Sequence, residues 1–221
     1  MENQIGEIRK PRRTKDRELA KLELISAVGE IIRTKGYTGL GVNQIAKQAG
    51  LHKKLIYNYF GDVDSLIEQY VIEKDFWLIA SEDLGSKATV NSEMDLKGNI
   101  CSILMEQFDF FYQEQEMQEL ILWELSGKSH LMTSISNVRE GLGEKVLTVT
   151  DQHFKDSEVN FRAVSAILTS AIYYLILHSK VSTFCGLNIQ ATPDREEILK
   201  TLRFFVDVAF DHAKKSPGKM K

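Results

Sequence analysis

The sequence has very little cysteine, and this scarcity excludes two classes of protein at once. The 221 residues include two cysteines, Cys101 and Cys185, and neither has a CxxC partner or a histidine at metal-ligand spacing. A disulfide framework and a zinc site therefore have no support. We expect both thiols to be reduced and structural, as in a cytoplasmic protein.

Long apolar runs and an apolar leader are also missing. The first ten residues, MENQIGEIRK, have no apolar core, so no secretion signal is expected. The longest uncharged run, residues 163–179, contains Ser165, Thr169 and Ser170, which makes it too short and too polar for a membrane span. A buried helix is the better interpretation of this run, and we expect no membrane association.

The motifs of common enzymes are absent. The sequence has no GxSxG, HExxH or GxGxxG, and the GKS run at 127–129 is not a phosphate loop because Leu122 occupies the position where that loop requires glycine. The five histidines lie on separate expected elements, and a metal pair of His153 with Asp156 is weak. We therefore expect no enzymatic activity, no cofactor and no metal.

The charge is unevenly distributed along the chain. The formal net charge is −3, but residues 1–60 carry +6 and residues 61–221 carry −9. A basic end on an acidic body is typical of a protein that binds a polyanion. From charge alone, a solvated basic tail on an ordinary acidic protein is an equally good interpretation.

The stretch from Val42 to Phe60, VNQIAKQAGLHKKLIYNYF, indicates a function. A short apolar helix pattern stops at Gly50, which suits the left-handed conformation that ends a helix. A second pattern, rich in Lys, Asn and Tyr, predicts a helix from His52 to Tyr59 with Leu55 and Ile56 facing inward. This is the outline of a helix-turn-helix.

The remaining periodicity predicts helices throughout, so the expected fold class is all-α. A first helix is predicted over 17–35. A long helix, capped by Asp62, is predicted over 62–84 and is expected to link two domains as a rigid strut. A loop is predicted at 85–92. Further helices are predicted at 93–113, 116–126, 129–154, 158–184 and 193–214. Glycines at 141 and 143 predict a bend or break in the third of these.

These elements predict a domain order. A flexible basic arm (1–16) precedes a three-helix DNA-binding module (17–61), a larger helical ligand-binding and dimerisation domain (62–215) and a frayed tail (216–221). The helix at 158–184 is apolar on more than one face and therefore needs partners on several sides. We expect it to form a four-helix homodimer interface with the helix at 193–214 of each subunit.

The N-terminal part resembles the TetR family of bacterial transcriptional regulators. The matching residues, at fixed spacing, are Gly36, Tyr37, Val42, Ile45, Ala46, Ala49, Gly50, Leu51, Tyr57, Tyr59, Phe60 and Leu66. The resemblance covers residues 17–67. It implies a cytoplasmic homodimer that binds a palindromic operator in double-stranded DNA, most often as a repressor, and that a small hydrophobic effector releases.

Side chains of the helix-turn-helix and the arm fit this role. Lysines and hydroxyls contact phosphates, and base edges supply specificity, with Asn suited to adenine. The expected DNA contacts are Asn43, Gln44, Lys53, Lys54, Tyr57, Asn58 and Tyr59, with Arg12 and Arg13 on the arm. For Tyr59, partial core packing is an equally good interpretation.

The sequence departs from the family pattern at several positions. Gly41 replaces a frequent Thr and so loses a cap and a hydroxyl, and Val63 replaces a frequent Lys between Asp62 and Asp64. His52, Lys54 and Leu55 replace small polar residues, so the operator should differ. The basic arm could compensate for weaker phosphate contacts. The competing hypothesis is a protein-interaction or ligand-binding module whose helix-turn-helix no longer binds DNA.

The body is rich in aromatic residues, which commonly line ligand cavities between helices. We expect Trp77, Phe111, Trp123 and Tyr173 to help line a cavity for a hydrophobic effector of unknown identity. For any one of these side chains, ordinary core packing is the competing interpretation.

Overall fold

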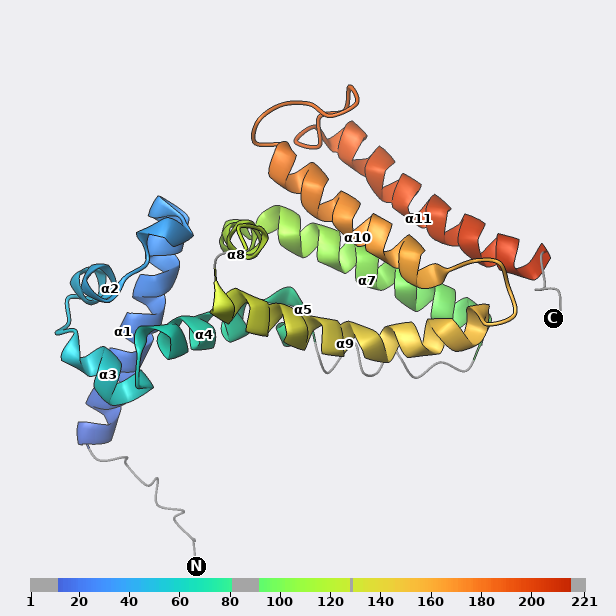
Figure 1. The fold of residues 1–221 in the computed structure, drawn as a ribbon. Coiled ribbons are helices and arrows are strands. Elements are labelled where there is room, and N and C mark those ends of the chain that lie inside the picture. The colour runs from blue at the N-terminus through green and yellow to red at the C-terminus, as the bar shows by residue number, and fades with distance from the viewer. Residues whose placement is uncertain (1–11, 81–91, 128, 216–221) are drawn as a thin grey trace, which may run out of the picture. The chain divides into compact units, whose positions relative to one another are not determined.

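The computed structural model describes residues 12–80, 92–127 and 129–215, and within these ranges the chain is helical and has no strand (Figure 1). The chain separates into two compact units, residues 1–73 and 74–221. A small N-terminal helical module followed by a larger helical region confirms the expected all-α fold class.

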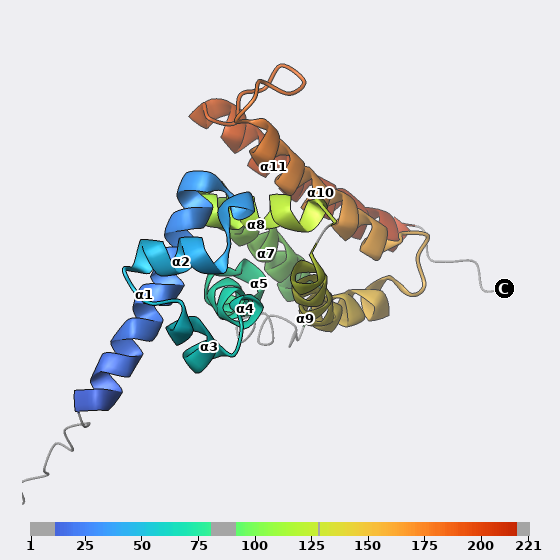
Figure 2. The ribbon, with the colours of Figure 1, turned by 60° about the vertical axis from the view of Figure 1, so that its left-hand side comes forward.

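The first unit is built around one apolar core. Its elements are α1 (Arg12–Lys35), the 3-10 turn η1 (Tyr37–Gly39), α2 (Val42–Ala49), α3 (Lys54–Phe60) and α4 (Val63–Lys74), of which Figure 2 shows the four α-helices. Each α-helix contributes one apolar face to the core. The fully buried side chains are Leu24, Val28, Ile31, Ile32, Ile45, Ile56, Leu66 and Val71.

The turn between α2 and α3 has the geometry that the sequence predicts. Gly50 has a φ of 65° and a ψ of 24°, in the left-handed region that ends helices. The backbone N–H of Gly50 donates to the carbonyl of Lys47 at 3.2 Å, and the N–H of Leu51 donates to that of Ala46 at 3.0 Å. These bonds satisfy the last carbonyls of α2 and turn the chain toward α3.

Helix α4 belongs to the first unit, whereas the sequence interpretation places residue 62 and everything after it in the second domain. The reason is that α4 buries its apolar face in the core of the module. Tyr70 packs against Gly29 of α1 so closely that a Cβ at position 29 would lie 2.9 Å from the tyrosine ring. Asp62 caps α4 as expected, because its Oδ1 accepts the N–H of Ser65 at 2.7 Å.

The predicted continuous helix over 62–84 is wrong, because the chain breaks at Asp75. Helix α4 ends at Lys74, Asp75 is extended with a φ of −77° and a ψ of 126°, and α5 (Phe76–Ile79) begins at once. The Asp75 carboxylate accepts the backbone N–H groups of Trp77 at 3.0 Å and Leu78 at 3.3 Å. This cap starts a new helix in place of continuing the old one. Most of the predicted loop at 85–92 lies outside the described residues.

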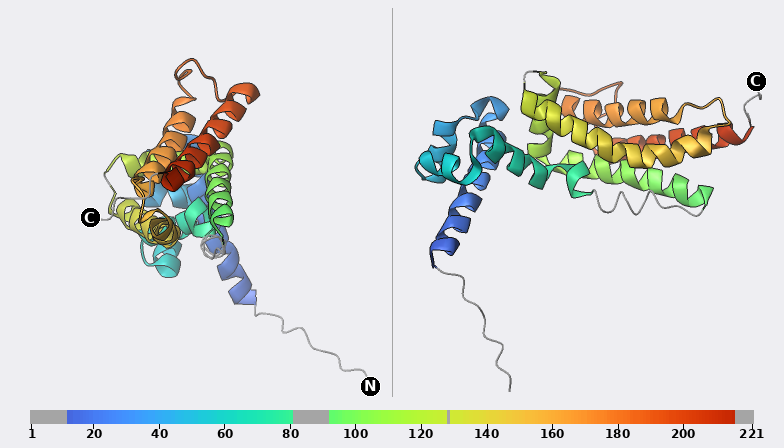
Figure 3. Two further views of the ribbon diagram at one scale, coloured as in Figure 1. Left: turned by 90° about the vertical axis from the view of Figure 1, so that its right-hand side faces the viewer. Right: turned by 60° about the horizontal axis from the view of Figure 1, so that its bottom comes forward.

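The second unit packs long helices along one another. Its helices are α5, α7 (Glu93–Gln113), α8 (Gln115–Leu125), α9 (His130–Phe154), α10 (Phe161–His178) and α11 (Thr192–Lys215). Helix α10 contacts α7, α9 and α11, as the two views of Figure 3 show. The rings of Phe154, Phe161 and Phe210 pack against one another at one end of the unit, with centroid distances of 4.6 to 5.7 Å.

Two of these helices differ from the sequence expectation. Helix α9 continues without a break through Gly141 and Gly143. Helix α10 is shorter than the predicted 158–184 at both ends, because the Asn160 side chain accepts the N–H of Ala163 and starts the helix there, and Ser179 ends it.

By length and mean hydropathy (1.4), α10 is apolar enough to cross a membrane, and 22% of its 18 residues are buried within the protomer. It nevertheless packs against three neighbouring helices, and Arg162 near its start pairs with Glu144 and Asp151 of α9. One such helix does not indicate a membrane protein.

Candidate DNA interface and candidate ligand cavity

The helix-turn-helix presents a row of exposed polar side chains. The first residues of α2 and the start and outer face of α3 supply them, while Ile45 and Ile56 hold the two helices against the core. The exposed side chains include Asn43, Gln44, Lys53, Lys54, Tyr57 and Asn58. Of the seven residues in this motif that the sequence predicts to contact DNA, six are therefore exposed to solvent.

The segment that carries this face has no acidic residue. Between Glu30 and Asp62 the sequence contains five basic side chains and no Asp or Glu. The basic residues are Arg33, Lys35, Lys47, Lys53 and Lys54. Such a segment attracts a polyanion at the contact itself, where short-range charges are least screened by salt.

Contacts within the motif orient two of its side chains. Lys53 Nζ donates to Asn43 Oδ1 at 3.5 Å, which links the start of α3 to the start of α2. The backbone N–H of Lys54 donates to His52 Nδ1 at 3.2 Å, so His52 supports the first turn of α3. The sequence interpretation treats His52 as a departure from the family pattern and gives it no structural role.

Tyr59 differs from its neighbours because it is half-buried. The guanidinium of Arg17 on α1 lies over the Tyr59 ring, 5.4 Å from its centroid, in cation–π geometry. Packing against α1 is therefore part of its role, which agrees with the core-packing interpretation from the sequence. Arg17, in turn, is held beside α3.

The last part of the predicted flexible arm, residues 12–16, is helical. Helix α1 begins at Arg12 and not at the predicted Arg17, so Arg12 and Arg13 lie in its first turn. The rest of the predicted arm, residues 1–11, lies outside the described residues. Gly41 precedes α2 without any side-chain cap, as the sequence indicates.

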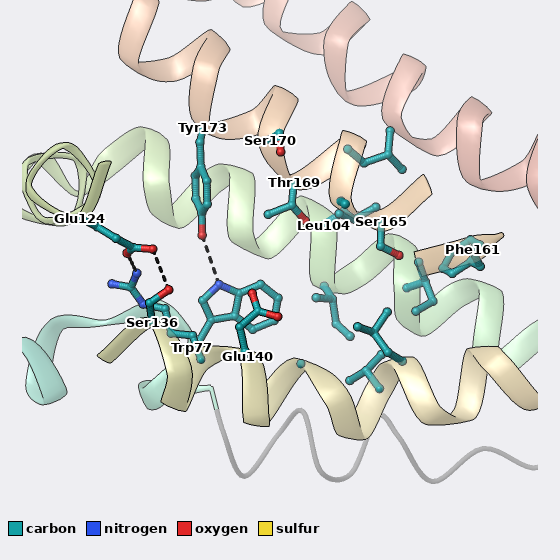
Figure 4. A pocket seen from close by; sticks show the side chains of 18 residues that line it. Trp77, Leu104, Glu124, Ser136, Glu140, Phe161, Ser165, Thr169, Ser170 and Tyr173 are labelled. Atoms are coloured by element: carbon teal, nitrogen blue, oxygen red, sulfur yellow. Dashed lines mark hydrogen bonds and ion pairs between the residues drawn. The ribbon is translucent and has the colours of Figure 1, made fainter. Parts of the chain in front are cut away.

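A cavity of about 380 Å³ lies within the second unit, between α7, α9 and α10 (Figure 4). This volume falls in the range of small-molecule sites. Trp77 and Tyr173 line it, as the sequence predicts, and Trp77 Nε1 donates to the Tyr173 hydroxyl at 3.2 Å. Phe111 and Trp123 are not part of the lining. Phe111 is 1% exposed and packs behind the cavity, with its ring centroid 4.8 Å from that of Tyr173.

The two ends of the cavity differ in chemistry. In Figure 4, Glu124, Ser136, Glu140 and Tyr173 gather toward one end, and Phe161 lies at the other. The remaining lining is mainly apolar: Ile100, Ile103, Leu104, Val146, Leu147 and Leu168. The cavity is therefore amphipathic along its length.

Arg139 organises the polar end. It is 8% exposed, its Nε donates to Asp75 Oδ2 at 2.5 Å, and its Nη1 donates to Glu124 Oε2. Nη2 also lies 2.5 Å from Asp75 Oδ2, although not in hydrogen-bonding geometry. Ser136 completes the arrangement by donating to the other oxygen of Glu124 at 3.0 Å. We call Asp75, Glu124 and Arg139 the Arg139 cluster.

The electrostatics of this region follow from burial. Burial by itself lowers the pKa of Arg139, but Asp75 and Glu124 outweigh it, so the pKa is raised and the guanidinium stays charged. Burial raises the pKa of the Tyr173 hydroxyl, against a smaller opposing effect of the hydrogen bond from Trp77. Tyr173 is therefore a neutral hydrogen-bonding group at physiological pH.

The sequence interpretation missed the Arg139 cluster, although one signal was present. Arg139 follows Met132 and Ile135 at helical spacing and precedes Val146, so a charged residue stands on the apolar face of α9. A charge at such a position needs a partner. The sequence pattern does not show which residue this partner is, because Asp75 lies 64 positions away from Arg139.

The weak metal pair suggested by the sequence has another explanation. The His153 ring packs against those of Phe154 and Phe210, at centroid distances of 4.8 and 4.9 Å. Among the described residues, no group of three or more His, Cys, Asp and Glu side chains is arranged to hold a metal.

Comparison with known proteins now adds to this geometry. Residues 24–70 match the family model described as bacterial regulatory proteins, tetR family. No curated protein matches the sequence.

Solved structures share the fold over nearly their whole length. A Clostridium perfringens protein described as a fatty acid metabolism regulator is 16% identical, with a TM-score of 0.61 over 83% of this chain and 96% of its own. NalD of Pseudomonas aeruginosa, the secondary repressor of the MexAB-OprM multidrug efflux pump, is 15% identical, with a TM-score of 0.58 over 85% and 95%. A TetR family transcription regulator from Marinobacter aquaeolei is 18% identical, with a TM-score of 0.54 over 91% and 97%. Residues 24–70 thus match the N-terminal domain of the tetR family of bacterial regulatory proteins, and the chain shares the fold of these solved regulators.

Proposed function

We propose that this protein is a dimeric transcriptional regulator that binds a palindromic operator and is released from it by a small molecule. The observation that carries the proposal is the exposed, acid-free face of α2 and α3 within the segment that matches the family model. A repressor is the default for this family, and no catalytic step is part of the proposal.

The DNA contacts follow from the chemistry of the exposed side chains. Lys53 and Lys54 bind phosphates or the O6/N7 edge of guanine, and Asn58 is suited to adenine in the major groove. Asn43 and Gln44 contact the backbone beside them. Tyr57 and Tyr59, together with Arg12 and Arg13 in the first turn of α1, complete the proposed interface.

The dimer is supported by apolar side chains that the protomer leaves exposed on α10 and α11, two helices that pack against each other. Exposed fractions are 68% for Ile167 and 51% for Tyr174 on α10, and 60% for Phe204 and 49% for Phe205 on α11. A soluble monomer rarely leaves so many large apolar groups on one pair of helices. We propose that the same two helices of a second copy cover them across a two-fold axis.

The effector site is the cavity of the second unit. Trp77 lines it two residues after Asp75, and Asp75 caps α5 just past the boundary between the units. A ligand that changes the arrangement at Asp75 thus acts on the segment that connects cavity and module. The ligand must bind the DNA-bound and released states with different affinity, since otherwise it shifts nothing.

Selection of bound fragments from random double-stranded DNA tests the proposal. We expect an enriched palindrome, because two copies related by a two-fold axis read two inverted half-sites. The selected site then serves in fluorescence anisotropy titrations at increasing salt. The Lys53→Ala/Lys54→Ala variant should bind more weakly, with a slope of log K against log salt that flattens by about 0.9 for each phosphate that the variant no longer neutralises.

Lys145→Ala/Lys155→Ala is the matched control, because it removes two exposed lysines from the second unit outside the proposed dimer helices. It should bind like the unmodified protein. A single unrepeated half-site would contradict the dimer. The absence of any enriched sequence would contradict DNA reading and favour an interaction module with a degenerate helix-turn-helix.

A further inference from the structure

We infer that the cavity selects amphipathic cations, molecules with an apolar body and one amine or quaternary ammonium group. This inference rests on the proposed effector site and names its ligand class. The cavity, its lining and the charges around its polar end carry the argument.

The polar end has more negative than positive formal charge. Glu124 and Glu140 line the cavity, and Asp75 bonds directly to Arg139, which is the single basic side chain among the described lining residues. Three carboxylates and one guanidinium leave a formal charge of −2. A low-dielectric wall of Ile, Leu and Val side chains strengthens this field inside the cavity.

The charge of Arg139 is already outweighed by two carboxylates. Its Nε and Nη1 donate to Asp75 and Glu124, and its Nη2, which makes no hydrogen bond, lies 2.5 Å from Asp75 Oδ2. A carboxylate ligand at this end would therefore add a fourth negative group to one buried cation. Like charges in such a site repel strongly.

Glu140 is the free anionic group of the site. It is exposed at the cavity and has no hydrogen bond or ion pair with any described residue. Trp77, whose indole ring offers a face for a cation, lines the same cavity, and both side chains are labelled in Figure 4. A ligand ammonium between Glu140 and Trp77 gains an ion pair and an aromatic contact together.

The rest of the lining fits an apolar body. The apolar side chains are Ile100, Ile103 and Leu104 on α7, Val146 and Leu147 on α9, and Phe161 at the far end. A volume of about 380 Å³ suits a small drug-sized molecule or a medium alkyl chain. Ser165 and Thr169 add two hydroxyls, which impose no net charge.

Three probes with one chain length and different head groups test the inference. Decyltrimethylammonium, decanol and decanoate are titrated by calorimetry into the purified full-length protein without DNA, each below its micelle concentration. We expect the cation to bind at least about tenfold more tightly than the alcohol, and the carboxylate more weakly than the alcohol. Glu140→Gln should weaken cation binding about three- to tenfold and leave decanol unchanged.

Asp109→Asn is the matched control, since it removes one exposed carboxylate from α7 away from the cavity. It should leave all three affinities unchanged. Tighter binding of decanoate, equal binding of all three probes, or binding of none would overturn the inference. If the cation binds as expected but does not release the protein from its selected DNA, this inference is supported and release by an effector is contradicted. The two proposals can therefore fail separately.

Discussion

The two units of this protein bury different kinds of side chain. In the described part of the first unit, the core is apolar apart from the hydroxyl of Tyr70. The described part of the second unit buries five polar or charged side chains: Asp75, Gln107, Gln118, Arg139 and Thr150. The first unit thus depends on local apolar patterns, whereas the second also buries an ion pair, Asp75 with Arg139, whose partners lie 64 residues apart in the sequence.

The difference fits the proposed division of labour. A module that presents fixed side chains to DNA needs a rigid apolar core and an exposed polar face. A domain that recognises a ligand needs polar groups inside, and these are costly to bury unless they are paired. The Arg139 cluster meets this requirement beside the cavity.

The largest effect is expected for Arg139→Met. Removing one partner of a buried ion pair costs about 3–5 kcal/mol, because Asp75 then stays buried without its cation. Urea unfolding, followed by tryptophan fluorescence of Trp77 and Trp123, measures the decrease in stability of the second unit.

Arg162→Met is the control for this experiment, because its two carboxylate partners are about half exposed. Its effect should be far smaller. An equal loss of stability in the two variants would contradict the expected difference between buried and exposed ion pairs.

Glycine-to-alanine substitutions should change the free energy of unfolding in opposite directions in the two units. Gly50 has a φ of 65°, which alanine adopts with strain, so Gly50→Ala should destabilise the first unit by about 1 kcal/mol. Gly141 lies inside α9 with open space around it, so Gly141→Ala should stabilise the second unit by about 0.5–1 kcal/mol. Thermal unfolding measures both, and a stabilising Gly50→Ala would contradict the left-handed turn.

The smallest effect is a pH dependence of the stability that surface ion pairs give to the second unit. Hydrogen bonds from Arg162 lower the pKa of Glu144 and Asp151 below their ordinary values of 4.5 and 3.8. The pairs therefore add stability above those values, which is lost as the pH falls through the lowered pKa values. The urea midpoint of Arg162→Met should differ from that of the unmodified protein at pH 7, and the difference should shrink as the pH falls below 3.8. A constant difference would show that the charge pairs contribute nothing.

Much of the architecture follows from residue patterns within short segments. The apolar spacing of α7 predicts both of its ends, Glu93 and Gln113, because Ser92 caps a helix whose periodicity is long and regular. Gly50 predicts the turn for the same local reason. Trp77 and Tyr173 could be proposed for the cavity, but Phe111 and Trp123 could not be separated from them, since aromatic residues in the core and in a cavity lining have the same pattern.

By itself, the sequence determined the all-α class, the helix-turn-helix and its exposed polar row, because each depends on residues a few positions apart. Only the tertiary structure decided that the helix after the module breaks at Asp75 and that α4 joins the first unit. Asp75 could have continued a helix. It caps a new one and pairs with Arg139, 64 residues away, because both are buried in one core where an unpaired charge is costly.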